Sequence, residues 1–95
     1  MNVGFADIPL IEHLRVISFM RRWIAQQPNK YRLVSTLDDV RRCKNDGILG
    51  ITFDIEGMCP VQEDISFVQT FYELGVRWML IAYNRSNAAG GGCMT

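Results

Sequence analysis

Apolar residues recur every three or four positions in the first third of the chain, which is the spacing of one face of an α-helix. The residues of this face are Leu10, Leu14, Ile17, Met20 and Ile24, widened by Ile11, Phe19 and Trp23. Asp7 is expected to cap the helix, with Pro9 in its first turn, and the turn residues 27–29 are expected to end it. The pattern predicts an amphipathic helix as the first element.

Two further helices are predicted between β-prone segments at residues 31–35, 48–55 and 76–83. Thr36-Leu37-Asp38-Asp39 resembles a capping box and starts the second helix, which Asp46-Gly47 ends. Asp64 is expected to cap the third helix, and Gly75 to end it. The expected buried positions of the third helix are Ile65, Val68, Phe71 and Leu74.

Helices and strands therefore alternate along the chain. Alternation with short connections is typical of α/β folds whose parallel strands are joined by right-handed crossovers. We expect a single domain over residues 1–95, with a C-terminal loop at 84–95 that is rich in Gly and Asn.

The second predicted strand has one apolar face and one small or polar face, because side chains alternate across a strand. The apolar row is Leu49, Ile51, Phe53 and Ile55, and the other row is Gly50, Thr52, Asp54 and Glu56. This pattern favours a barrel, in which the apolar row packs on outer helices and the polar row faces the interior. Glu56 would then lie at the carboxyl end of the strand, where barrel enzymes place their chemistry.

The alternation of side chains along the strand alone also allows non-functional roles for both carboxylates. Glu56 could be a solvated residue at a strand end. Asp54 could be a buried carboxylate whose oxygens are satisfied by neighbouring donors.

Composition narrows the class of protein. Ten basic and ten acidic residues give no net charge, so neither nucleic acid nor an anionic membrane is an expected partner. The three cysteines are odd in number and form no CxxC pair, which favours reduced thiols in the cytoplasm. No signal peptide or membrane-spanning stretch is evident in the sequence.

Two motifs resemble the renal (membrane) dipeptidase family, peptidase family M19. One is the strand end ITFDIEG at residues 51–57, and the other is YELGVR at 72–77 followed by AYN at 82–84 and Asn87. The segment YRLVSTLDD at residues 31–39 is also similar to the family. The resemblance implies a (β/α)8 TIM barrel, of which this chain would supply about three parallel strands and three helices.

The resemblance also implies a chemistry, the hydrolysis of dipeptides by two zinc ions that one glutamate bridges. By position in the motif, that glutamate corresponds to Glu56. A carboxylate suits this role because its two oxygens can hold two cations that act on one water. Tyr83 lies where many members have a histidine that assists the tetrahedral intermediate; a phenol can donate a hydrogen bond but carries protons poorly at neutral pH.

Three residues after Tyr83 are candidates for shaping a substrate loop. They are Asn84, Arg85 and Asn87, and a role as plain turn and capping residues is an equally good interpretation.

Most of the family's metal ligands have no counterpart in this sequence. The resemblance implies an N-terminal His-x-Asp and two later histidines, whereas the chain has one histidine, His13, which we expect to be a helix-surface or packing residue. Because zinc needs about four ligands, we expect an inactive barrel fragment that does not bind zinc tightly.

An incomplete barrel leaves strand edges unpaired and is expected to self-associate, with Met79 and Ile81 as uncovered barrel-facing side chains.

Three functional hypotheses remain. The chain is a dipeptidase half-site that other strands complete, or a truncated relic that forms a non-catalytic α/β oligomer. A phosphate-binding module built on Gly90-Gly91-Gly92 is the weakest, since no P-loop lysine follows.

Overall fold

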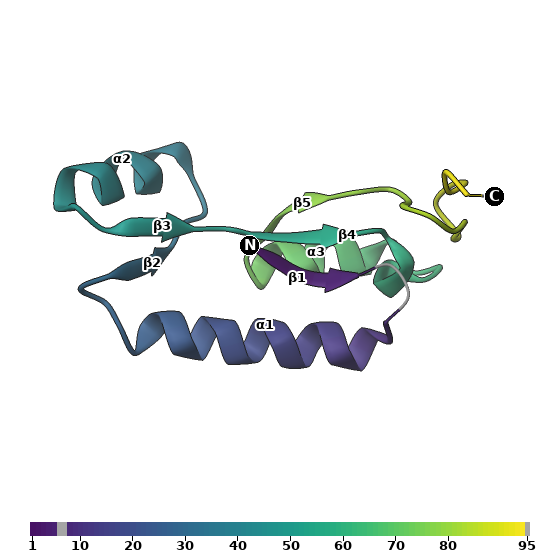
Figure 1. Ribbon diagram of the computed structural model, residues 1–95, viewed down its shortest axis with the longest axis horizontal. Helices are drawn as coiled ribbons and strands as arrows, with labels where there is room; N and C mark the ends of the chain where they lie inside the picture. The colour runs from purple at the N-terminus through teal and green to yellow at the C-terminus, as the bar shows by residue number, and fades with distance from the viewer. Residues whose placement is uncertain (6–7, 95) are drawn as a thin grey trace.

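The structure, a computed structural model, describes residues 1–5 and 8–94. Within these residues, β1 (Asn2–Phe5), β4 (Phe53–Glu56) and β5 (Val76–Met79) form a sheet in the order β1-β4-β5. A second sheet pairs β2 (Tyr31–Leu33) with β3 (Leu49–Ile51), as Figure 1 shows. Every strand pair is parallel, which confirms the predicted arrangement.

The predicted strand at residues 48–55 is two strands in the structure. Its first part, β3, pairs with β2, and its second part, β4, pairs with β1 on one side and β5 on the other. The chain therefore passes straight from the small sheet into the centre of the larger one, and β1 is a strand that the sequence pattern did not predict.

Three α-helices connect the strands in the described part of the chain: α1 (Leu10–Ala25), α2 (Leu37–Asp46) and α3 (Ser66–Glu73). A short 3-10 helix, η1 (Cys59–Val61), follows β4. Pro9 immediately precedes α1, and the predicted cap Asp7 lies outside the described residues.

The capping box of α2 is confirmed. The Thr36 hydroxyl accepts from the Asp39 N–H at 3.1 Å, and the Asp39 carboxylate accepts from the N–H groups of Ser35 (2.9 Å) and Thr36 (3.1 Å). These hydrogen bonds, the one from Ser35 above all, lower the pKa of Asp39 because they stabilise the charged carboxylate. Gly47 ends the helix in the left-handed conformation, φ 68°.

Asp64 is not the N-cap of α3 as predicted: it lies one residue before the N-cap, Ile65, and bonds to the first helical residue, Ser66. Its Oδ1 accepts from the Ser66 hydroxyl and from the Ser66 N–H at 3.0 Å, and the Ser66 hydroxyl is the main reason that the pKa of Asp64 is lowered. Phe71 is buried, and Val68 and Leu74 pack partly buried against the core. The predicted burial of Ile65 is wrong: this residue precedes the helix, and it is 76% exposed.

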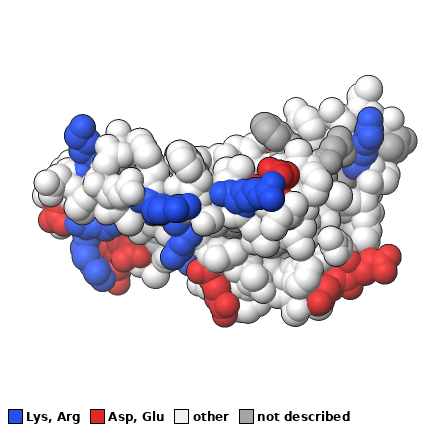
Figure 2. Space-filling model, turned by 90° about the horizontal axis from the view of Figure 1, so that it is seen from below, with Lys and Arg blue, Asp and Glu red and all other residues white. Residues whose placement is uncertain are grey.

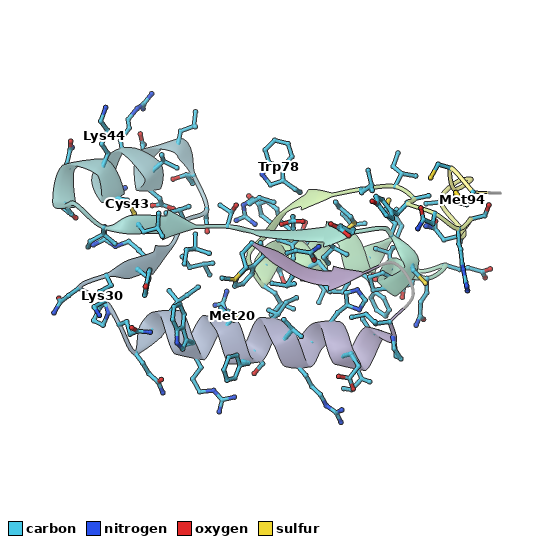
Figure 3. All side chains as sticks on the ribbon, viewed as in Figure 1. Met20, Lys30, Cys43, Lys44, Trp78 and Met94 are labelled. Carbon is cyan, nitrogen blue, oxygen red and sulfur yellow. The ribbon has the colours of Figure 1, made fainter. Side chains whose placement is uncertain are left out.

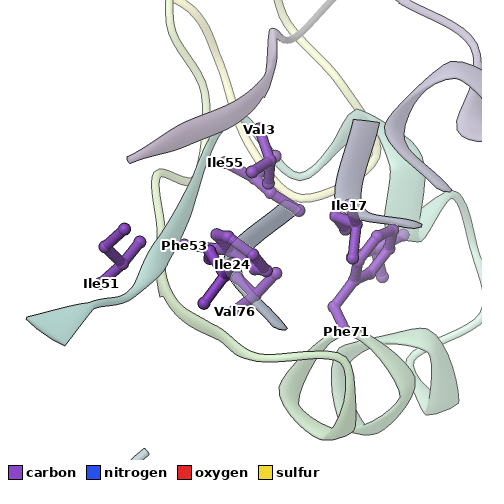
Figure 4. Close-up of a cluster of buried hydrophobic side chains, with 9 residues drawn as sticks. Val3, Ile17, Ile24, Ile51, Phe53, Ile55, Phe71 and Val76 are labelled. Atoms are coloured by element: carbon purple, nitrogen blue, oxygen red, sulfur yellow. The ribbon is translucent and has the colours of Figure 1, made fainter. Parts of the chain in front are cut away.

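The core lies between the three-stranded sheet and the helices α1 and α3. Side chains from all of these elements meet in it, as the close-up in Figure 4 shows: Val3, Ile17, Ile24, Phe53, Ile55, Phe71 and Val76. Ile51 also joins it, so the apolar row of the predicted strand is confirmed from Ile51 to Ile55. Leu49, the first residue of β3, is an exception and is 62% exposed.

The pairing of β5 with β4 contains an extra residue. Phe53 pairs with Val76 but Asp54 pairs with Trp78, so Arg77 bulges out of the register. Consequently Met79 packs against the core, and the prediction that it faces the barrel interior is wrong. Trp78 takes that side instead: it points away from α1 in Figure 3 and is 72% exposed.

Charged groups of both signs are mixed on the side of the molecule that carries α1, as Figure 2 shows. Within the described residues, none of the helices has the length and apolar character needed to cross a bilayer.

Candidate functional site

Glu56 is the last residue of the central strand β4, on the side of the sheet opposite the core. Its half-buried side chain continues the row of Thr52 and Asp54, which are also half-buried, whereas Phe53 and Ile55 between them are buried. Glu56 is in register with Phe5 of β1, and the neighbouring Ile55 carbonyl accepts from the Leu80 N–H at 3.0 Å. The carboxylate therefore lies at the carboxyl end of a parallel sheet and not against an apolar helix.

Asp54, two residues earlier in the same row, has a partner in the chain terminus. Its Oδ1 is 3.5 Å from the Met1 ammonium, which also donates to the Thr52 carbonyl at 2.9 Å. The side chain is 35% exposed, so Asp54 is not the buried carboxylate that the sequence allowed. The Met1 ammonium and the Asp54 carboxylate form a partly solvated ion pair.

Tyr83 lies four residues beyond the end of β5, so the predicted strand at residues 76–83 is shorter than expected and Tyr83 belongs to the connection that follows it. Its side chain is 52% exposed, and its carbonyl accepts from the Cys93 N–H at 2.8 Å. Together with the bond from the Met94 N–H to the Asn84 carbonyl (2.9 Å), this contact closes residues 83–94 into a compact loop. Tyr83 is therefore the first residue of a closed loop that follows the carboxyl end of β5.

The polar residues after Tyr83 shape this loop. The Asn84 Oδ1 accepts from the Cys93 thiol at 3.4 Å, and the Asn87 side-chain amide donates to the Ile81 carbonyl at 2.8 Å. Arg85 is exposed in the same loop. These contacts give Asn84 and Asn87 the turn-stabilising role, while a role of the three residues toward substrate stays a prediction.

The described residues do not form a metal site. They contain no group of three or more His, Cys, Asp or Glu side chains placed to share an ion. Glu56 could supply one ligand, but zinc takes about four, so the side chains present do not fit a metal pair. No step of hydrolysis can be assigned to a metal held by these residues.

His13 lies on the core side of the sheet and is fully buried. Its Nδ1 is 3.1 Å from the Pro9 carbonyl oxygen, and its ring makes an edge contact with Phe71 at a centroid distance of 6.5 Å. A Cβ atom at Gly4 would overlap this ring, so the glycine in β1 makes room for the histidine. The sequence allowed a packing role for His13, and the structure assigns that role.

One hollow of the described surface lies between elements that do not carry Glu56. It has a volume of about 840 Å³ and runs between α1 and β2. None of the predicted site residues lines it.

Comparison with known proteins gives a family and a fold. The model of the membrane dipeptidase family, peptidase family M19, matches residues 9–95. An uncharacterized dipeptidase of Schizosaccharomyces pombe is 28% identical over 75 residues, which are 78% of this chain and 18% of that protein. An uncharacterized protein from the pqqA 5′ region of Klebsiella pneumoniae is 29% identical over 76 residues, covering 80% of this chain and 28% of its own length.

Among solved structures, an amidohydrolase from Pseudomonas aeruginosa superimposes with a TM-score of 0.92 at 23% identity. The match covers 99% of this chain and 29% of that one, so the chain corresponds to under a third of each of these proteins. The superposition shows the fold, a part of a TIM-type barrel. The match of the family model over residues 9–95 shows that this chain belongs to the membrane dipeptidase family, peptidase family M19.

Proposed function

We propose that this chain supplies part of the barrel wall of a zinc-dependent dipeptidase and presents Glu56 as a metal ligand. One observation carries the proposal: in a chain of this family, Glu56 is a half-buried carboxylate at the carboxyl end of the central parallel strand. Barrel enzymes build their active sites at that end.

Within this proposal, Tyr83 donates a hydrogen bond from its phenol toward the substrate, since its half-exposed ring follows the neighbouring strand β5. Asn84 and Asn87 hold the loop that carries it, and Arg85 is exposed in the same loop, where we propose that it faces substrate. The thiols of Cys43, Cys59 and Cys93 are all free, in keeping with the cytoplasmic location that we propose.

We expect the chain alone to hydrolyse neither Ala-Ala nor Gly-Leu, with or without added zinc. The reason is that one glutamate leaves a metal pair without most of its ligands. The measurement is product release by the purified chain, together with a zinc titration. Turnover above the buffer control, or a zinc affinity in the nanomolar range, would contradict this part of the proposal.

We also propose that the chain self-associates. In the described sheet β1 and β5 are edge strands, and apolar side chains at and beyond β5 are exposed, with Trp78 at 72%, Leu80 at 46% and Ile81 at 57%. Unpaired strand edges beside apolar side chains favour pairing with another chain.

Sedimentation at micromolar concentration should therefore show a species larger than the 10.9 kDa monomer. Replacing Trp78 by lysine should shift the distribution toward monomer, because a charge on the exposed face opposes association. A wild-type chain that sediments as a monomer would rule out self-association.

A further inference from the structure

The hollow between α1 and β2 has apolar walls. Half-buried apolar side chains from α1, β2 and the end of α3 line it, together with two buried isoleucines of α1: Leu14, Tyr31, Leu33 and Leu74, with Ile17 and Ile24. Its volume of about 840 Å³ falls in the range of roughly 300–1,000 Å³ that is typical of small-molecule sites. The hollow is therefore large enough to receive an apolar ligand.

The hollow follows α1 lengthwise. The lining residues of this helix recur every three or four positions from Leu14 to Ala25, so they share one face of it. At the helical rise of 1.5 Å per residue this face is roughly 16 Å long. An extended alkyl chain laid along α1 would contact successive turns of the helix, which a compact ring would not.

All charged side chains in the lining are basic. They are Arg21, Arg22 and Arg32, and the lining includes no acidic residue of the described part of the chain. Arg32 pairs with Asp46 at 3.1 Å, whereas Arg21 donates to the Leu74 carbonyl at 2.7 Å. Within residues 1–5 and 8–94, neither Arg21 nor Arg22 forms an ion pair with an acidic side chain. An apolar hollow beside two cations without carboxylate partners matches a ligand with an apolar chain and a negatively charged end.

Tyr31 is held in the wall of the hollow by an aromatic contact. Its ring stacks on that of Trp23, with 4.7 Å between the centroids and an interplanar angle of 27°. Stacked rings in this arrangement stabilise each other beyond their buried area. The position of Tyr31 is thus fixed before a ligand arrives, and the fluorescence of Trp23 should report on what contacts it.

We propose that this hollow binds a medium-chain fatty carboxylate as a free monomer. The alkyl chain lies along the apolar face of α1, against Tyr31 and Leu33, and the carboxylate pairs with Arg22 beside Arg21. This inference goes beyond the proposed function and does not rest on it, because none of the predicted site residues lines the hollow.

The test is a fluorescence titration of the Trp78→Lys variant, which opposes self-association and leaves Trp23 as the single tryptophan. We expect decanoate, kept below its micellar concentration, to change the Trp23 emission saturably. Decanoate should bind roughly fivefold to fifteenfold more tightly than octanoate, because each buried methylene group contributes a factor of up to about four. The uncharged 1-octanol should bind roughly twofold to fivefold more weakly than octanoate, the size expected of an exposed ion pair.

Two variants in the same background separate the charged and apolar parts. Arg22→Gln should weaken octanoate binding by roughly twofold to fivefold and leave 1-octanol binding unchanged. The matched control Arg15→Gln, on α1 but outside the lining, should change neither. Ser18→Phe fills the hollow from an exposed position on α1 and should abolish the saturable change for all three ligands.

Four results would overturn the inference. Equal affinity for octanoate and decanoate would mean that only the charged end binds, and full binding by the Ser18→Phe variant would place the ligand elsewhere. A Trp23 emission that changes with protein concentration and not with decanoate would mean that a second copy fills the hollow. Sedimentation with phosphatidylglycerol vesicles, without a response to monomeric decanoate, would show a membrane-binding surface in place of a fatty-carboxylate site.

Discussion

Phe53→Ala should remove about 3–5 kcal/mol of the free energy of unfolding, the usual cost of emptying a buried phenylalanine site. Phe53 is fully buried where the chain passes from β3 into β4, and it packs in one cluster with Ile24 of α1 and Val76 of β5 (Figure 4). Its loss leaves a cavity between the sheet and its helices. Because small domains are stable by only about 5–15 kcal/mol, the variant should be close to unfolding at room temperature.

Urea denaturation at a fixed protein concentration measures this effect, since association would otherwise change the apparent stability. Phe19→Ala on the outer side of α1 is the matched control, because that phenylalanine is 60% exposed. We expect the control to change stability by no more than about 0.5 kcal/mol. A loss below about 1 kcal/mol for Phe53→Ala would mean that the core is not packed as described.

Glu56→Gln should have the largest effect on activity, in a protein that restores the rest of the barrel. The Pseudomonas amidohydrolase is a suitable host because this chain superimposes on part of it with a TM-score of 0.92. In a chimaera, residues 1–94 of this chain replace the matched part of the host. An amide has one oxygen where a carboxylate has two, so glutamine cannot bridge a pair of cations.

We expect Glu56→Gln to lower kcat/KM of the chimaera by roughly a hundredfold or more. Changes to residues that only hydrogen-bond to a metal ligand typically cost roughly 10–100-fold, and the loss of a ligand should cost at least as much. The reference is the chimaera with Glu56 intact, assayed on the substrate that the host itself hydrolyses. Glu73→Gln makes the same chemical change on the exposed side of α3 and should leave kcat/KM unchanged. Equal losses in both variants would point to a folding defect and would contradict a specific role for Glu56.

Much of the fold could be predicted, because the capping and alternation signals in the sequence agree with the start of α2 and with the buried positions of β4 in the structure. The capping box at Thr36 and Asp39 is set by neighbours three residues apart, so sequence spacing alone reveals it. The alternation from Ile51 to Glu56 likewise predicts which side of β4 packs on helices, and with it the side on which Glu56 lies. The second signal indicates the side of β4 on which Glu56 lies, whereas the metal role of Glu56 is implied by the family resemblance and stays a prediction.

The strand β1 and the bulge at Arg77 could not be predicted in this way. Asn2–Phe5 is short and contains a glycine, and its pairing with Asp54, Ile55 and Glu56 joins residues about fifty positions apart. The bulge depends on how β5 pairs with β4, and the hydrophobic pattern of the sequence does not indicate it. Because of the bulge, Trp78 and not Met79 lies on the exposed side of the sheet. Long-range register decides both features.

The burial of His13 is indicated by its spacing from the apolar residues of α1. His13 falls three residues after Leu10 and four before Ile17, so it lies on the apolar face of α1 and is buried there. The glycine that accommodates its ring, Gly4, belongs to the unpredicted strand. A buried histidine on the core side explains why the single histidine of the chain does not join Glu56.

The metal content of the chimaera tests the central claim most directly. Elemental analysis after gel filtration should find two zinc ions per chain when Glu56 is present and fewer than one when glutamine replaces it. If the Glu56→Gln chimaera kept both ions, Glu56 would not be the bridging ligand, and its place at the end of β4 would have no bearing on catalysis.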